Sequence, residues 1–115
     1  MTIIKSIPET LSNKQKYDLT MSPKTQKMSS VKGSVLEIAA ACIYDDVDAK
    51  SGEIRTVLSI QTPEGETFAT NSATFREDFE RMLDLFGADG LTAIEVISGY
   101  SKAGREFITC AYAGD

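Results

Sequence analysis

The sequence contains no histidine and no tryptophan among its 115 residues. Without histidine the chain lacks the usual general base near neutral pH, the Ser–His and Cys–His nucleophile pairs, and the commonest metal ligand. These absences exclude most familiar hydrolases. We therefore expect a protein that is not an enzyme and that needs no cofactor and no metal ion.

Cysteine and long apolar runs are also scarce. Cys42 and Cys110 lie far apart in apolar stretches rather than at C-x-x-C spacing, so both are expected to be reduced thiols that pack in the interior. The longest apolar run, Ile38–Tyr44, is far shorter than the roughly 20 residues that cross a bilayer. The N-terminus lacks the pattern of a signal peptide, so we expect a cytosolic protein without a membrane partner.

Charge is distributed unevenly along the chain, whose formal net charge is -5. Residues 1–32 carry six lysines against two acids, a net of +4, whereas residues 33–115 carry six basic residues against fifteen acids, a net of -9. A chain of this length is one typical domain. We interpret 1–32 as a basic, irregular N-terminal leader with at most one short helix, around Lys14–Leu19, and 33–115 as the folded domain. The lysines either keep the leader soluble or contact a polyanion.

Three strands are expected after the leader. The run Val35–Tyr44 is apolar on both faces for most of its length, which is typical of a central strand. Ile54–Gln61 alternates as a half-buried strand does, and Thr67–Thr70 is a short third strand after the turn Thr62–Gly65. Together they predict a meander.

A helix and two more strands follow. Thr74–Glu77 fits a capping box, and Gly87 fits a C-terminal cap. Between them the apolar side chains fall at helical spacing: Phe75, Phe79, Met82, Leu83 and Phe86. The final strands are expected at Leu91–Ser98 and Glu106–Ala113, joined by the hairpin loop Gly99–Arg105.

This order of elements predicts a mainly β fold. Three strands, a helix and two strands match a five-stranded OB-like Greek-key barrel with one helix between strands three and four, a fold that commonly binds oligonucleotides. An open α+β sheet with the helix on one face has the same elements. We favour the barrel because the first strand is long and apolar on both faces.

Aromatic side chains next to cations are the candidate binding residues. Stacking of a base on an aromatic ring tolerates any base sequence, and cations neutralise phosphates. The expected rings are Tyr100, Phe107 and Phe68, and the expected phosphate contacts are Arg55, Lys102, Arg105, Lys24, Lys27 and Lys32. Phe68 and Phe107 are equally well explained as core residues. Tyr100, in a loop bounded by glycines, is harder to explain by packing.

From Gly33 to about Ala113 the chain resembles the single-stranded DNA-binding proteins of small tailed bacteriophages that replicate linear DNA by protein priming. The resemblance lies in the order and spacing of several short stretches: Gly33–Leu36, Ser51–Ile54, Pro63–Glu66, Leu85–Ala88, Ile94–Val96 and Lys102–Thr109. It implies an OB-type fold without enzymatic activity. It also implies sequence-independent coating of single strands during phage DNA replication, in the cytoplasm of the bacterial host.

The leading hypothesis is therefore a single-stranded DNA-binding protein that also meets phage replication proteins, with a monomer and a weak homo-oligomer both open. The alternative is a phage-encoded acidic interaction module that inhibits a host protein. That alternative rests on the acidic helix residues Glu77, Asp78, Glu80 and Asp84. A solvated helix face explains such a run equally simply.

Overall fold

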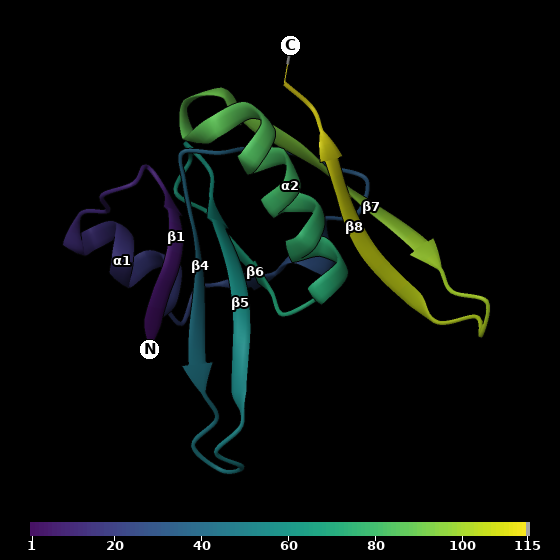
Figure 1. Ribbon diagram of the computed structural model, residues 1–115, viewed down its shortest axis with the longest axis horizontal. Coiled ribbons are helices and arrows are strands. Elements are labelled where there is room, and N and C mark those ends of the chain that lie inside the picture. The colour runs from purple at the N-terminus through teal and green to yellow at the C-terminus, as the bar shows by residue number, and fades with distance from the viewer. Residues whose placement is uncertain (115) are drawn as a thin grey trace.

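The structure is a computed structural model that describes residues 1–114, which form two β-sheets and two α-helices (Figure 1). The strands are β1 (Thr2–Ile7), β2 (Gln26–Lys27), β3 (Val35–Glu37), β4 (Ala40–Val47), β5 (Ile54–Gln61), β6 (Thr67–Thr70), β7 (Ala93–Tyr100) and β8 (Glu106–Tyr112). The helices are α1 (Asn13–Thr20) and α2 (Ala73–Gly90), with a short 3-10 turn at Met28–Val31. No helix among these residues is long and apolar enough to cross a membrane.

The predicted meander is confirmed. β4, β5 and β6 are consecutive antiparallel strands, with Ile43 opposite Leu58 and Ile60 opposite Phe68. The turn between β5 and β6 is closed by the Gly65 N–H, which donates to the Thr62 carbonyl at 2.9 Å. The full order in this sheet is β1-β4-β5-β6-β2.

Both faces of the five-stranded sheet are covered. On one face Phe75 and Phe79 of α2 are almost fully buried against Ile43, Leu58 and neighbouring apolar side chains. Burying a phenylalanine stabilises a fold by roughly 1.5–3 kcal/mol, so α2 contributes strongly to this core. On the opposite face, residues before and within α1 complete a second, smaller core whose members are Leu11, Leu19, Ala40, Cys42 and Tyr44.

The expectation of an irregular leader over residues 1–32 is wrong, because this segment forms β1, α1 and β2, of which the sequence indicated only the short helix. β1 pairs antiparallel with β4, and Ser12 caps α1 by accepting a hydrogen bond from the Gln15 N–H at 3.1 Å. Met28 is completely buried and Leu19 nearly so. The sequence signal is weak because α1 buries a single residue, Leu19, and β1 is short.

A closed barrel is not found. The predicted strand Val35–Tyr44 divides into β3 and β4, which belong to different sheets, and β3 joins the three-stranded sheet β3-β7-β8. Within residues 1–114 no strand pairing links the two sheets. The edge of β6 that could continue the sheet is instead paired with β2, in parallel. Closure of a barrel requires pairing all the way round, which this arrangement lacks.

The predicted helix is confirmed, with a shifted start. Ser72, not Thr74, is the N-cap, and its side chain accepts from the Phe75 N–H at 3.2 Å. Gly87 interrupts the helix with φ of 78°, a value that favours glycine. Just before it, the Phe86 ring stacks on Tyr112 of β8 with centroids 4.2 Å apart. These contacts hold α2 against the three-stranded sheet.

Candidate nucleic-acid interface

The β7–β8 hairpin projects from the body of the protein (Figure 1). Its strands are antiparallel with continuous register from Ile94 opposite Tyr112 to Tyr100 opposite Glu106. The loop is closed by the Ser101 N–H, which donates to the Arg105 carbonyl at 2.8 Å, and Gly104 supplies a positive φ of 80°. The hairpin therefore presents its end as an ordered turn.

The two faces of the three-stranded sheet differ. The inner face packs on α2 through Leu36, Ile94, Val96, Ile108 and Cys110. The outer face carries the alternate residues, namely Val35, Glu95, Ile97, Gly99, Phe107, Thr109 and Ala111. Three large apolar side chains of the outer face are exposed, Val35 by 55%, Phe107 by 40% and Ile97 by 37%.

Phe107 lies across the hairpin from Gly99. A Cβ added at Gly99 would stand 2.9 Å from the Phe107 Cζ, closer than real side chains approach. The absence of a side chain at Gly99 thus gives the phenyl ring its place on the outer face. Sequence reasoning selected Phe107 but missed Gly99, Val35 and Ile97. Alternation along the strands puts these residues on one face, but this can be recognised only when the pairing of the strands is known.

Tyr100 lies on the other side of the hairpin from Phe107, because directly paired residues share a face and Tyr100 pairs with Glu106. Its side chain is 71% exposed. Lys32 donates to the Glu106 carboxylate, and this bond, with a further one from Tyr100, lowers the pKa of Glu106. Lys32 is therefore near the hairpin, but its charge is shared with Glu106.

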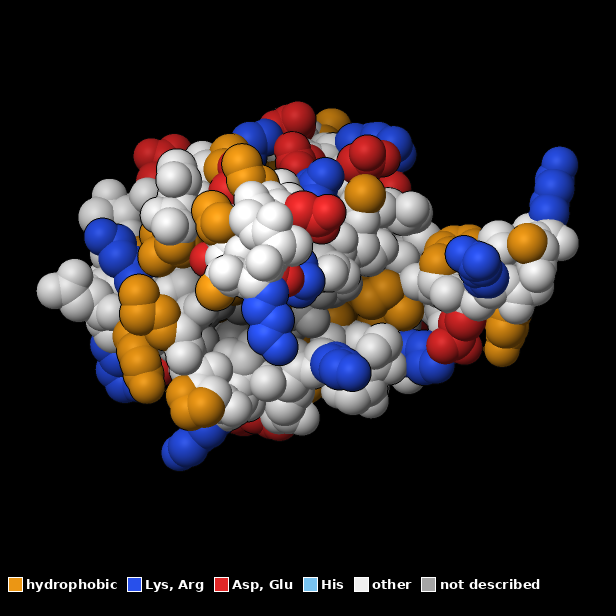
Figure 2. All heavy atoms as spheres, turned by 90° about the horizontal axis from the view of Figure 1, so that it is seen from below, with side chains coloured by type: hydrophobic (Ala, Val, Ile, Leu, Met, Phe, Trp, Pro, Cys, Tyr) orange, Lys and Arg blue, Asp and Glu red, His pale blue; other side chains and the backbone are white. Residues whose placement is uncertain are grey.

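Two cations at the hairpin end are free of ion pairs. Lys102 and Arg105 are exposed, and neither has an acidic partner among residues 1–114. Figure 2 shows the projecting hairpin with basic and hydrophobic side chains together on it. The structure thus brings together Tyr100, Lys102, Arg105 and Phe107 on one element.

The other expected residues lie elsewhere. Phe68 is 3% exposed within the main core, where its ring cannot stack on a base. The prediction of Phe68 as a stacking residue is therefore wrong. Arg55 lies on β5 and pairs with Asp48 at 2.6 Å. The pKa of Asp48 is lowered, mainly by the Lys50 backbone N–H and also by Arg55.

Lys24 and Lys27 are exposed near β2, on the five-stranded sheet. Lys24 borders a polar cavity of about 360 Å³ together with Asp18 and Gln61. Asp18 accepts from Lys14 at 2.8 Å and from Gln61 at 3.0 Å, and these bonds lower its pKa. Among residues 1–114 no hydrogen bond or ion pair joins Lys24 or Lys27 to the hairpin.

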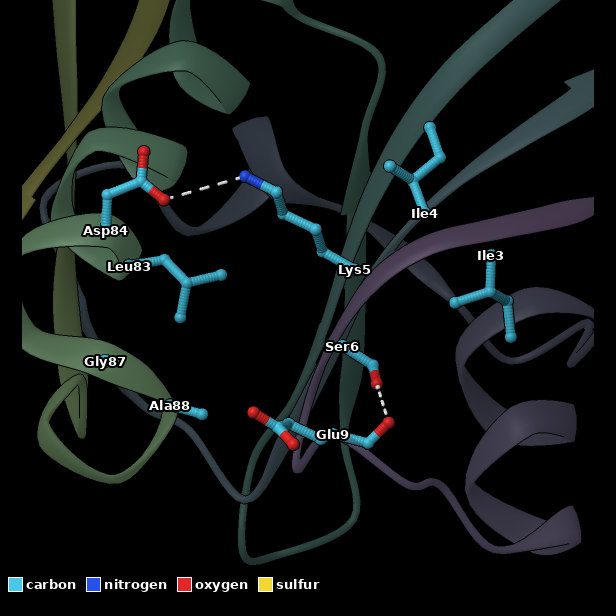
Figure 3. A pocket seen from close by; sticks show the side chains of 9 residues that line it. All are labelled: Ile3, Ile4, Lys5, Ser6, Glu9, Leu83, Asp84, Gly87 and Ala88. Atoms are coloured by element: carbon cyan, nitrogen blue, oxygen red, sulfur yellow. Dashed lines mark hydrogen bonds and ion pairs between the residues drawn. The ribbon is translucent and has the colours of Figure 1, made fainter.

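A cavity of about 560 Å³ lies between β1 and the end of α2 (Figure 3). Lys5 is the cation that lines it, and the Lys5 Nζ lies 3.7 Å from Asp84 and 3.6 Å from Glu80. Because this lysine already faces two carboxylates, the cavity is a poor site for a polyanion. The same ion pairs, with Arg76–Glu80 and Arg81–Asp78, partly neutralise the acidic face of α2.

Both thiols of the chain lie in the interior. Cys42 and Cys110 are buried free thiols, as predicted, and burial raises the pKa of each to about 12. No group of three or more potential metal ligands occurs in the described part of the chain. Comparisons with protein-family models, curated proteins and solved structures found no match.

Proposed function

We propose that this chain binds single-stranded DNA without sequence preference, through the β7–β8 hairpin. The observation that carries the proposal is the combination on one projecting element of two exposed rings, Tyr100 and Phe107, with two free cations, Lys102 and Arg105. Rings supply sequence-tolerant stacking and cations supply phosphate contacts. Together they suit an unpaired strand, whose bases are free to stack.

The opposite placement of the rings defines how the strand would run. One base stacks on Phe107 at the outer face, another stacks on Tyr100 at the opposite side, and the backbone crosses the hairpin end near Lys102 and Arg105. Each stacked base contributes about 1–3 kcal/mol. The exposed apolar side chains of Val35 and Ile97 lie further along the same outer face, with Glu95 opposite Val35.

An open variant of the OB-like barrel is part of this proposal. It is supported by the order of β4, β5, β6, α2, β7 and β8, and by the sharp division of the first strand into β3 and β4. OB folds commonly bind ligands on the face of their second and third strands. Here Leu11, just before α1, and Leu19, within it, pack on that side of the sheet. The β7–β8 hairpin, which joins strands four and five of such a fold, is a part of that site that is open to solvent.

The setting of the activity is proposed on the sequence resemblance alone. Coating of displaced strands during phage DNA replication, in the cytoplasm of a bacterial host and alongside phage replication proteins, agrees with a small protein that has no evident catalytic group. The rival role as an acidic inhibitor of a host protein is less well supported, because Asp78, Glu80 and Asp84 already have basic partners.

A titration with oligo-dT at two salt concentrations tests the proposal. If Lys102 and Arg105 alone neutralise phosphates, the slope of log affinity against log salt is about -1.4, and further cations make it steeper, at about -0.7 per contact. The double variant Tyr100→Ala/Lys102→Ala should bind much more weakly. Absence of binding by the unaltered protein at low salt would refute the function, and unchanged binding by the double variant would refute the site.

A further inference from the structure

The end of the β7–β8 hairpin carries a single carboxylate among several cations. From Gly99 to Phe107 the acid is Glu106, and the cations are Lys102 and Arg105. Lys32 is a third cation at this place, because its Nζ donates to the Glu106 carboxylate. Within residues 1–114, Glu106 thus neutralises a cation from outside the hairpin, while the two cations of the hairpin stay free of ion pairs.

The position of Lys32 beside the hairpin is set by the backbone that follows it. The Gly33 N–H donates to the Val96 carbonyl at 2.7 Å, and the Val96 N–H donates to the Ser34 carbonyl at 2.9 Å. The Lys32 side chain is 37% exposed and the Glu106 side chain 38%, so both are partly shielded from water. The ion pair therefore joins segments that backbone hydrogen bonds already hold together.

Tyr100 lies on the same side of the hairpin as this ion pair. It stands opposite Glu106 in the ladder, and directly paired residues share a face. The pKa of Glu106 is lowered, first by the hydrogen bond from Lys32 and also by one from the Tyr100 hydroxyl. An ammonium and a hydroxyl thus meet at one oxyanion of the protein itself. A phosphate ester offers the same kind of charged acceptor oxygen.

We propose that Lys32 and the Tyr100 hydroxyl form a phosphate-binding site for the bound strand, and that Glu106 occupies this site in the free protein. The inference rests on the proposed function, because the phosphate belongs to the nucleotide whose base stacks on Tyr100. Lys102 and Arg105 lie at the hairpin end, so Lys32 supplies the cation on the side of Tyr100. The strand must displace Glu106 to reach it.

This exchange limits how tightly the strand is held. A phosphate that replaces Glu106 gains one partly exposed ion pair while the protein loses another of the same kind, so the net gain is small. The displaced carboxylate also stays near the phosphates and repels them. Removal of the negative charge of Glu106 should therefore raise the affinity for DNA, whereas removal of a residue that contacts DNA lowers it.

Titration of Glu106→Gln with oligo-dT at several salt concentrations tests the site. The variant is expected to bind about two- to fivefold more tightly than the unaltered protein, the effect of one exposed ion pair. Its slope of log affinity against log salt should be steeper by about 0.7, because one more cation meets a phosphate. In the double variant Lys32→Gln/Glu106→Gln that cation is gone, and the slope should return to the value of the unaltered protein.

Glu95→Gln is the matched control for the change of charge. It removes one carboxylate from an exposed residue of β7 that has no basic partner among residues 1–114, and its slope should stay unchanged. An unchanged slope in Glu106→Gln, or an equal rise in Glu95→Gln, would overturn the inference and leave the proposed function standing. Absence of oligo-dT binding by the unaltered protein would instead refute the function.

A second measurement needs no DNA. Inorganic phosphate is titrated into the unaltered protein, Glu106→Gln and the double variant, while NMR follows the backbone signals of Lys32 and Tyr100. We expect these signals to shift in Glu106→Gln at lower phosphate concentrations than in the unaltered protein, and to stay in place in the double variant. Absent or equal shifts in the three proteins would show that phosphate does not bind at Lys32. Circular dichroism confirms that each variant is folded.

Discussion

The Tyr100 and Phe107 rings stand on opposite sides of the same hairpin, seven positions apart in sequence and one register step apart in the ladder. Both are exposed, yet neither can reach a base that is stacked on the other. A strand bound by both must cross the hairpin end, where Lys102 and Arg105 lie.

Removal of either ring should weaken binding independently. Tyr100→Ala and Phe107→Ala are each expected to reduce oligo-dT affinity by about 1–3 kcal/mol. Because the rings share no partner, the double variant should equal the sum of the two losses within about 0.5 kcal/mol. Fluorescence anisotropy measures all three, with Tyr17→Ala on α1, also exposed, as the control. Normal binding by both single variants would contradict the model of stacking on this hairpin.

The free cations should set the salt dependence. Lys102→Ala and Arg105→Ala are each expected to make the slope of log affinity against log salt shallower by about 0.7, the value for one phosphate contact on a single strand. Lys16→Ala on α1 removes an equal charge from an exposed position away from the hairpin and should leave the slope unchanged. A slope that falls equally in all three variants would point to a general charge effect.

Gly99 should matter for binding more than for stability. In Gly99→Ala the new methyl group would meet the Phe107 ring at 2.9 Å, and this half-exposed ring is free to swing aside. We expect less than about 1 kcal/mol loss in the free energy of unfolding, below the usual range for overpacked cores, together with a clear loss of affinity. In a Phe107→Ala background the same change should cost no further affinity, and a further loss there would show that Gly99 acts by another route.

Glu106 should contribute to stability only when ionised. Its pKa is lowered in the folded protein, first by the hydrogen bond from Lys32, so the carboxylate stabilises the fold above the ordinary glutamate pKa. This contribution is lost as the pH falls through the lowered folded pKa. The melting temperatures of the unaltered protein and Glu106→Gln should therefore converge at acid pH. In an NMR titration Lys32→Ala should shift the Glu106 midpoint upward, and an unmoved midpoint would argue against the pair.

Leu19 tests whether residues 1–32 belong to the folded structure. It lies on the buried side of α1 and is 1% exposed, and truncation of a buried leucine to alanine typically costs about 2–5 kcal/mol. We expect Leu19→Ala to lower the urea midpoint accordingly, whereas Tyr17→Ala, on the exposed side of the same helix, should change it little. Equal midpoints for Leu19→Ala and the unaltered protein would mean that the segment is detached in solution.

The elements with strong local patterns could be predicted from the sequence. α2 has an apolar stripe through Phe75 and Phe79, and β5 and β7 alternate clearly, so their type and approximate bounds agree with the structure. β1 could not be predicted in this way, and for α1 the sequence indicated a short helix but not its packing against the sheet. Their burial depends on partners distant in sequence, such as Cys42 and Tyr44 for Leu19, and their own patterns are weak.

The site was predictable only in part. Loop chemistry and glycine spacing identified the hairpin that carries Tyr100 and Phe107. The assignment of Phe68 failed because an alternating strand does not reveal which of its faces is covered, and α2 covers the one that Phe68 occupies. The opposite placement of the two rings follows from the register, which depends on the number of residues in the loop.

The central strand β5 has covered surfaces on both sides, with Leu58 and Ile60 under α2 and Ser59 completely enclosed on the side of α1. The hairpin beyond Ser98 has no second layer of side chains of this kind. Backbone amides in β5 should therefore exchange with deuterium only when the whole chain unfolds, and those around Lys102 should exchange through local opening. The protein would thus combine a rigid five-stranded sheet with a flexible hairpin end that can adapt to irregularly spaced nucleotides.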